Sequence, residues 1–328
     1  MLKVSIVMCI YNVDKSYLCQ ALDSLLNQTY KNIEIVCIND GSTNNIEETL
    51  NEYREKDPRI KVFSQENKGV SESKNVGIKY CTGDYITFFD SDDTCSPDTI
   101  ETTVNIAEKY DSDVIINFLN ARLNLKNKGP KDFSYTASWQ HVTKKSFLEK
   151  HPELVFTKGL KIGEDAIYSH KLFALTDKID INKDSVIYYR RHLSQATSIQ
   201  NPKSLEKWLK SIDVWFDEII PFYDKYNLWE KKKAHFINYI IEQPFTVYIK
   251  FNWSNSDKQY LFKKIKSIIS EHYSNIDFKI KSLRTLLFAI FLKCPNYIMF
   301  ELFRYISVLC NRIVEYRKIK QSQKHYDE

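Results

Sequence analysis

The hydrophobic positions of the first 120 residues follow two alternating periods. Short, nearly continuous apolar runs are typical of buried strands, and the stretches between them carry apolar residues every three or four positions, as one face of a helix does. The strand-like runs cover residues 3–10, 33–38, 60–63, 85–89 and 113–118, and the helix-like stretches cover residues 16–26, 46–56, 70–80 and 97–110. This repeated alternation predicts an α/β fold with a mostly parallel, doubly wound sheet.

The pattern changes twice further along the chain. Residues 120–160 are irregular, and Gly163-Glu164-Asp165 then leads into an apolar helix over residues 166–175. A late strand is expected over residues 186–191. From about residue 204 the pattern is helical to the end. We therefore expect an α/β domain over residues 1–205 and an all-helical region over residues 206–328.

Polar residues follow three of the predicted strands. Tyr11 follows the first, Asp40 follows the second, and three carboxylates within four residues follow the fourth, namely Asp90, Asp92 and Asp93. Ligands of open α/β sheets bind beyond the carboxyl ends of the strands, so these side chains are expected at one edge. Crowded carboxylates repel one another unless a cation lies between them, and oxygen ligands suit a hard divalent ion that also holds phosphates. The alternative is a solvated acidic turn, because Asp and Ser favour turns.

Charge divides the chain in the same place as the pattern. Residues 1–205 carry 26 basic and 28 acidic side chains, a net charge of −2, whereas residues 206–328 carry 21 and 14, a net charge of +7. An acidic site in the first part and a basic, aromatic second part suggest two different tasks. The seven scattered cysteines include no Cys-x-x-Cys pair, which argues against zinc and a disulfide framework and favours a reducing cytosol. The apolar start of the chain is too short for a signal peptide.

Four ordered motifs carry a resemblance to a known family. They are Val4 to Asn12 (VSIVMCIYN), Asn39 to Thr43 (NDGST), Glu66 to Ser71 (ENKGVS) with Asn75-Val76-Gly77, and Gly83 to Asp93 (GDYITFFDSDD). In this order and spacing they resemble glycosyltransferase family 2, whose nucleotide-sugar-binding fold is called GT-A. Gly163-Glu164-Asp165 and Tyr189-Arg190 resemble later landmarks of the family, so the resemblance covers roughly residues 3–195. Cys9, Asn39 and Ser73-Lys74 depart mildly from the family pattern.

The resemblance implies roles for individual residues. It implies that Asp165 is the general base, that Asp40 accepts a hydrogen bond from the base of the nucleotide, and that Asp90, Ser91 and Asp92 bind the nucleotide sugar. Beside the resemblance, Tyr11 offers a flat face on which the nucleotide base can stack, and Lys74 could meet a diphosphate as a point charge. The resemblance also implies that Asp92 and Asp90 hold Mn²⁺ or Mg²⁺. Arg190 and His192 lie at the end of the late predicted strand, where they could clamp a phosphate, and Glu164 and Asp93 are further candidates for acceptor or phosphate contacts. Each residue also has a structural interpretation: Glu164 and Asp165 suit the first turn of a helix, Lys74 suits a solvated helix face, and Tyr11 suits a packed turn.

The last part of the chain has a different character. Residues 283–309 are apolar and aromatic, interrupted by Lys293 and Pro295, and flanked by Lys and Arg. The segment is too interrupted for a spanning helix. It suits a pair of helices lying on an anionic membrane surface, and a dimerisation or packing helix is the alternative. No nucleic-acid motif is present. The cysteine usage and this segment lead us to expect a cytoplasmic protein that is peripheral on the inner face of the membrane.

Together with the resemblance, which implies inversion at the sugar carbon, these features predict a metal-dependent, inverting glycosyltransferase. It would move a sugar from a nucleotide diphosphate, with a UDP-sugar as the expected donor, to a hydroxyl of a surface glycan or a lipid-linked oligosaccharide. The alternatives are a processive capsule or polysaccharide polymerase of the same family and a non-catalytic, membrane-associated scaffold. A nucleotidyltransferase of the same fold is disfavoured, because the loop Tyr11 to Asp14 lacks glycine.

Overall fold

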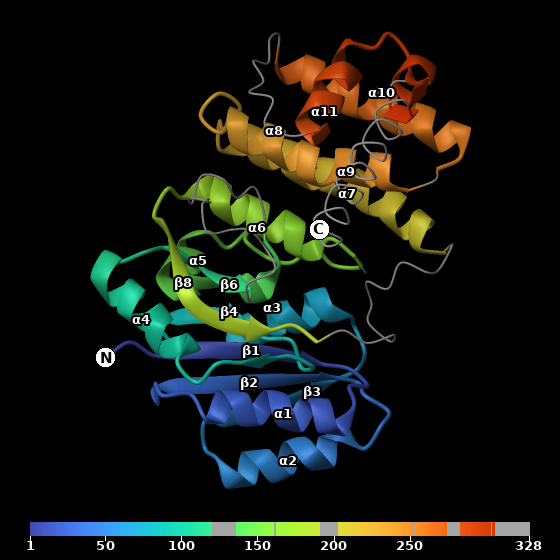
Figure 1. Cartoon of the computed structure of the whole chain (residues 1–328). Coiled ribbons are helices and arrows are strands. Elements are labelled where there is room, and N and C mark those ends of the chain that lie inside the picture. The colour runs from blue at the N-terminus through green and yellow to red at the C-terminus, as the bar shows by residue number, and fades with distance from the viewer. Residues whose placement is uncertain are drawn as a thin grey trace, which may run out of the picture. The chain divides into compact units, whose positions relative to one another are not determined.

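The computed structural model describes residues 1–119, 136–160, 162–190, 203–251, 253–273, 283–302 and 304–305. The chain forms two compact units, Met1–His235 and Phe236–Glu328. The first unit contains the sheet with its covering helices, and the second is helical (Figure 1).

The first unit is built on an eight-stranded sheet in the order β3-β2-β1-β4-β7-β6-β8-β5. The strands are β1 (Val4–Ile10), β2 (Ile33–Asp40), β3 (Ile60–Gln65), β4 (Tyr85–Phe88), β5 (Thr94–Cys95), β6 (Val114–Leu119), β7 (His141–Lys144) and β8 (Ile179–Tyr188). Neighbours β3, β2, β1 and β4 are parallel, as are β6 and β8, whereas β7 is antiparallel to both of its neighbours. The predicted mostly parallel sheet is confirmed.

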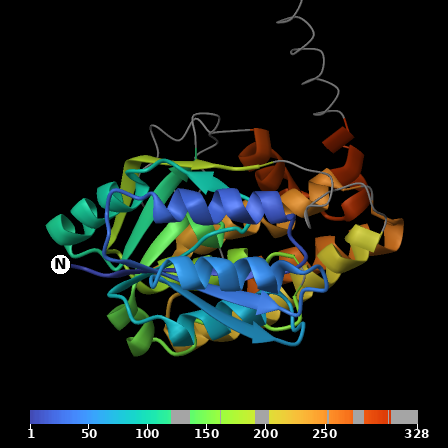
Figure 2. The ribbon, with the colours of Figure 1, turned by 90° about the horizontal axis from the view of Figure 1, so that it is seen from below.

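Helices cover both faces of this sheet (Figures 1 and 2). They are α1 (Lys15–Leu26), α2 (Ile46–Lys56), α3 (Val70–Tyr80), α4 (Thr99–Tyr110), α5 (Lys145–Lys150) and α6 (Glu164–Leu175). The next helix, α7 (Lys203–Lys225), packs on α6. Strand residues alternate between two apolar clusters: Ile6 packs with α1, α2 and α4 in one, and Val7 packs with α3, α5 and α6 in the other. Alternation along β1 and β2 therefore produces the doubly wound arrangement.

Some elements differ from the sequence-based expectations. The short strands β5 and β7 were not predicted, because His-Val-Thr-Lys in β7 carries a single aliphatic residue. Strand β8 begins at Ile179, earlier than expected, because its first half (IDINKD) is polar. Residues 120–135, part of the region predicted to be irregular, lie outside the described residues. The helical region begins at Lys203, near the predicted boundary, but α7 belongs to the first compact unit.

The second unit contains the end of α8 (Lys233–Glu242), then α9 (Pro244–Lys250), α10 (Asn255–His272) and α11 (Leu283–Lys293). Its core is aromatic: Phe245 contacts the rings of Phe288, Phe291 and Phe300, and Phe291 contacts those of Phe288 and Phe300. Residues 297–302 and 304–305 are helical after a break at residues 294–296. Among the described residues, no helix is both long and apolar enough to cross a membrane.

Candidate active site

The strand ends bring the first predicted site residues to one edge of the sheet. In the parallel register of β1 and β2, Ile10 pairs with Asn39, so Tyr11 and Asp40 leave the sheet side by side. Asn12 joins the two loops. Its backbone N–H donates to Ser42 Oγ at 3.1 Å, and its side-chain Oδ1 accepts from the backbone N–H of Thr43 at 2.8 Å. Tyr11 is 54% exposed, as a ring that is available to stack on a flat ligand would be.

Asp40 is buried and already holds a neighbouring loop. Its Oδ1 accepts from Gln65 Nε2 at 2.7 Å and from Lys68 N at 2.9 Å, and its Oδ2 accepts from Gly69 N at 2.8 Å. Next to it, Gly41 adopts a φ of +69°, and a Cβ there would lie 2.6 Å from Asn67 N. The carboxylate therefore fixes the loop that precedes α3, and its predicted contact with a nucleotide base stays a prediction.

The acidic loop after β4 places three carboxylates together. Ligand oxygens of Asp90, Asp92 and Asp93 all lie within 4.8 Å of one another, with Ser91 between the first two in the chain. Burial raises the pKa of Asp90 to about 7, and Asp165 and Asp92 push it the same way against the charge of Lys74. Burial likewise raises the pKa of Asp93 to about 7. Each of these shifts means that the cluster resists carrying its full negative charge.

The donor set of this loop fits a hard divalent cation. Asp93 Oδ1 accepts from the backbone N–H of Arg190 at 2.7 Å, whereas its buried Oδ2 has no hydrogen-bond partner among the residues that the structure describes. A buried carboxylate oxygen without a donor is costly. Carboxylate oxygens at this spacing are the ligands that Mg²⁺ and Mn²⁺ prefer. A bound cation would remove the repulsion between the carboxylates and give Asp93 Oδ2 a partner.

Lys74 forms ion pairs with the predicted base and with the residue before it. Its side chain is buried on α3, and Nζ lies 2.5 Å from Asp165 Oδ1 and 3.2 Å from Glu164 Oε1. The ammonium also lies 4.9 Å from the centre of the Phe156 ring. Burial opposes its charge, but Asp165 and Glu164 outweigh burial and raise its pKa. The ammonium is therefore held by two carboxylates, and its predicted contact with a diphosphate stays a prediction.

Glu164 and Asp165 occupy the first turn of α6, as their position in the sequence suggested. Burial raises the pKa of Glu164, which Lys74 only partly offsets. Burial also acts to raise the pKa of Asp165, but the nearby charge of Lys74 prevails and the pKa of Asp165 is lowered. Asp165 is consequently ionised at neutral pH, which a general base requires.

A residue that sequence reasoning missed fixes this turn. Gly163 adopts a φ of +84°, and a Cβ there would lie 2.6 Å from the ring of Trp215 on α7. Trp215 Nε1 donates to Gly163 O at 3.3 Å, and Ser211 Oγ on the same helix donates to Ile162 O at 2.9 Å. No signal in the sequence tied Trp215 to a turn 52 residues away.

Arg190 lies at the site and contacts the acidic loop and α1, and its predicted phosphate contact stays a prediction. Its Nε donates to Asp92 O at 2.7 Å, its Nη2 donates to Gln20 Oε1 at 2.6 Å, and its guanidinium lies 4.3 Å from the Tyr17 ring. With the backbone bond to Asp93, these contacts tie the end of β8 to the acidic loop and to α1. Arg190 therefore positions the carboxylates. His192 lies outside the described residues.

Comparison with known proteins identifies the class. The model of the glycosyl transferase family 2 matches residues 5–174, so this chain belongs to glycosyl transferase family 2 and is a glycosyltransferase. GlyG of Streptococcus pneumoniae is 31% identical over 239 residues, which are 64% of this chain and 76% of GlyG. GlyA of the same organism is 31% identical over 238 residues, but this chain spans only 33% of its length. EpsH of Bacillus subtilis, a putative glycosyltransferase, is 27% identical over 81% of each chain.

Solved structures agree on the fold. TarS residues 1–349 from S. aureus, in complex with UDP-GlcNAc, superposes with a TM-score of 0.65 at 19% identity, covering 83% of this chain and 82% of that one. The mannosyltransferase PcManGT from Pyrobaculum calidifontis, in complex with GDP-Man and Mn²⁺, gives a TM-score of 0.55 at 13% identity, covering 94% and 85%. At these identities the likeness concerns the fold, and it agrees with the predicted GT-A architecture.

Proposed function

We propose that this protein is a metal-dependent, inverting glycosyltransferase that uses a nucleoside diphosphate sugar, with a UDP-sugar as the expected donor. The observation that carries the proposal is the crowded Asp90–Asp93 cluster, which is electrostatically coupled to the Lys74–Asp165 pair. Relatives support the donor class: TarS binds UDP-GlcNAc and PcManGT binds GDP-Man with Mn²⁺.

The acidic loop would hold the metal ion. Asp92 and Asp90 are its proposed ligands, and the unpartnered Oδ2 of Asp93 offers a third oxygen. A divalent cation at this point neutralises charge on a departing diphosphate, which lowers the barrier to its departure. Arg190 would keep the ligands in place through its bonds to the Asp92 carbonyl and the Asp93 carboxylate.

Asp165 would take the proton of the acceptor hydroxyl. The hydroxyl oxygen forms a bond to C1 of the donor sugar while the bond from C1 to the diphosphate oxygen breaks, and the proton passes to the Asp165 carboxylate. Because Lys74 makes Asp165 a weak base, the transfer is expected late, when bond formation to C1 has made the hydroxyl acidic. Attack opposite the leaving group inverts C1.

The acceptor is proposed to be a hydroxyl of a surface glycan or of a lipid-linked oligosaccharide. A relative that is 29% identical over 255 residues, GgaB of Bacillus subtilis, is a minor teichoic acid biosynthesis protein, which supports an acceptor of this class. Glu164, beside the proposed base, is the residue expected to meet it. An inner-membrane location suits such an acceptor, and a processive mode of transfer would act on the same class.

A panel of nucleotide sugars tests the donor. UDP-glucose, UDP-galactose, their N-acetylated forms and GDP- and dTDP-sugars are each added with Mn²⁺ or with EDTA, and thermal unfolding is recorded. Saturation with one UDP-sugar is expected to raise Tm by about 5 °C with Mn²⁺, and this shift should disappear with EDTA. The anomeric configuration of the product, read by NMR, tests inversion.

Two variants make the panel specific. Asp92→Asn is expected to lose the Mn²⁺-dependent shift, whereas Asp57→Asn, which breaks a remote ion pair with Arg59, should keep it. The proposal fails if no nucleotide sugar shifts Tm with or without metal, an outcome that would favour the scaffold.

A further inference from the structure

The short helix after α11, residues 297–302 and 304–305, exposes apolar side chains, whereas its charged side chains contact the rest of its own unit. Ile298, Met299, Leu302 and Tyr305 are 65%, 43%, 62% and 64% exposed, and Ile298, Leu302 and Tyr305 follow the i, i+4, i+7 spacing of one helix face. We call these four residues the apolar face. Single exposed hydrophobic residues are ordinary, but a contiguous group of them marks an interaction site.

The opposite side of the same helix carries the charges. Glu301 Oε2 lies 2.7 Å from Arg304 Nη2 and 3.1 Å from Lys258 Nζ on α10, and Arg304 Nη1 donates to Ile249 O at 3.2 Å. Phe300, on this inner side, is completely buried. The helix thus places an ion-pair network against its own unit and directs aliphatic side chains away from it. This is the reverse of the polarity expected of a helix that faces water.

The charge around the apolar face decides between two candidate partners, a second copy of the chain and a lipid surface. Arg284 and Lys293 on α11 are exposed, and among described residues 283–302 and 304–305 no acidic side chain is exposed. The following residues, 306–328, carry five basic and three acidic residues in their sequence. A second copy of the chain would bring like charges together, whereas an anionic lipid surface attracts basic side chains as it accepts apolar ones.

We propose that the apolar face inserts into the surface of an anionic lipid bilayer, with Arg284 and Lys293 contributing attraction to the lipid headgroups. The helix would lie in the interface with Ile298 and Leu302 among the acyl chains and Tyr305 near the headgroups. This inference does not depend on the proposed donor, and its experiment uses no nucleotide sugar.

The test measures co-flotation of the full-length chain with vesicles. Phosphatidylcholine vesicles are compared with vesicles that also contain phosphatidylglycerol, at low and high salt. Binding to the anionic vesicles is expected, and it should weaken in high salt because salt screens the attraction. Ile298→Ser/Leu302→Ser should reduce the partition coefficient at least about tenfold, and Arg284→Gln/Lys293→Gln should reduce it about fivefold per charge.

Two control variants come from the same unit. Tyr260→Ser removes an aromatic ring on α10 that is 44% exposed, and Lys263→Gln removes an exposed charge of the same helix. Both should float as the wild type does. All variants change exposed positions, so their Tm values should match the wild type, which excludes unfolding as the cause of any loss.

Three results would overturn the proposal. Equal flotation of the wild type and Ile298→Ser/Leu302→Ser would show that the face does not contact lipid. A dimer in light scattering that this double variant converts to a monomer, without any lipid binding by the wild type, would assign the face to a second copy. A monomeric wild type that ignores both kinds of vesicle would indicate that another segment of the chain covers the face.

Discussion

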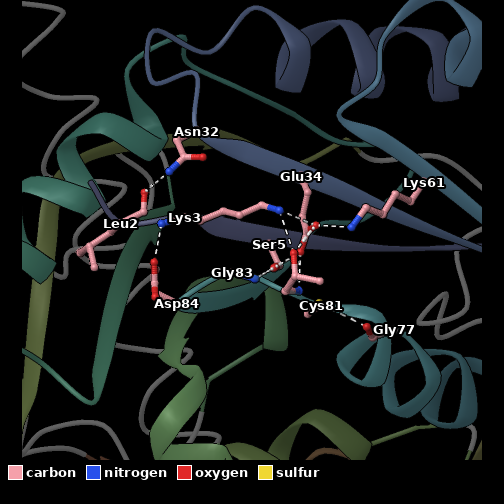
Figure 3. A network of polar contacts seen from close by, with 11 residues as sticks. Leu2, Lys3, Ser5, Asn32, Glu34, Lys61, Gly77, Cys81, Gly83 and Asp84 are labelled. Carbon is pink, nitrogen blue, oxygen red and sulfur yellow. Dashed lines mark hydrogen bonds and ion pairs between the residues drawn. The ribbon is translucent and has the colours of Figure 1, made fainter.

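The two ends of the parallel sheet use the same kind of side chain in opposite ways. At the end where the strands begin, the buried carboxylate of Glu34 on β2 meets donors from three neighbouring segments (Figure 3). It accepts from Lys3 Nζ at 2.9 Å, Lys61 Nζ at 2.6 Å, Ser5 Oγ at 2.6 Å, and Thr82 N and Oγ1 at 2.5 and 2.8 Å. Burial acts to raise the pKa of Glu34, but these donors prevail and lower it.

At the end where the strands finish, Asp40 also meets three donors, but Asp93 meets a donor from the described residues at only one of its two carboxylate oxygens. The pKa values of Asp90 and Asp93 are raised to about 7, and Asp93 Oδ2 has no partner among the described residues. The satisfied carboxylate of Glu34 ties β1, β2, β3 and the turn before β4 together, so it stabilises the fold. The unsatisfied ones cost stability in the free protein, as groups reserved for a ligand do. The difference separates a structural carboxylate from a functional one.

The largest expected effect belongs to the functional end. Asp165→Asn removes the proposed base and keeps the shape of the side chain, so kcat should fall by about 10²–10⁴-fold. The donor-dependent rise in Tm should persist, because Glu164 still holds Lys74. Steady-state kinetics and thermal shift on the same preparation make the measurement. A variant that turns over within a few-fold of the wild type would remove Asp165 from the mechanism.

Substitution of Glu34, at the end where the strands begin, should have the opposite result, a loss of stability without a loss of turnover. Glu34→Gln places an amide N–H₂ where two lysines and a hydroxyl donate, and should lower the free energy of unfolding by about 2–4 kcal/mol. Turnover per folded molecule should be unchanged. Because the pKa of Glu34 is lowered on folding, its contribution is present above the unfolded pKa of about 4.3 and is lost as the pH falls further.

Urea unfolding measures this loss against a matched pair. Glu149→Gln breaks an exposed i,i+4 contact with Lys145 at 3.6 Å and should cost less than about 0.5 kcal/mol. If Glu34→Gln and Glu149→Gln prove equally mild, the Glu34 network is not a source of stability and the contrast between the two ends is wrong.

The position of the proposed base can be tested through its glycine. Gly163→Ala must adopt a left-handed φ and displace Trp215, whereas Gly159→Ala meets a φ of +73° with nothing within 4 Å of the new Cβ. Both should lose about 1–2 kcal/mol of stability from backbone strain. Only Gly163→Ala should also lose activity, by about tenfold or more, because the first turn of α6 shifts. Equal activities of the two variants would mean that Trp215 has no positioning role.

The sequence predicted the parts of this molecule that depend on local patterns. Buried runs such as residues 3–10 and 33–38 identify parallel strands whatever lies beside them, and the acidic residues after β4 follow from the strand that ends there. The edge where Tyr11, Asp40 and the acidic loop gather followed from the topology of the sheet.

Long-range partners were beyond these patterns. Lys74 looked like a solvated helical lysine or a phosphate ligand, and its burial against Glu164 and Asp165 joins residues about 90 positions apart. Arg190 was expected to meet a phosphate, which stays a prediction, and nothing local indicated its hydrogen bond to Asp92 O. Nothing local in α7 indicated that Trp215 packs on Gly163. A single sequence carries the chemistry of these side chains but not their partners.

The smallest expected effect is the pH dependence of the functional end. The pKa values of Asp90 and Asp93 are higher in the folded protein, at about 7, than in the unfolded chain, at about 3.9. The folded state therefore binds more protons between these values, and their contribution to stability falls as the pH rises from about 4 to 7.

Mn²⁺ competes with those protons, so it should raise Tm more at pH 8 than at pH 5.5. Asp90→Asn should stabilise the metal-free protein at pH 8 by up to about 1 kcal/mol, flatten the pH dependence and weaken the response to Mn²⁺. Thermal unfolding of both proteins across this pH range, with Mn²⁺ or EDTA, measures all three effects. The contrary result is a metal-free wild type whose stability rises from pH 5.5 to 8 while that of Asp90→Asn does not. It would mean that the acidic loop is satisfied without a cation and that the two ends of the sheet do not differ.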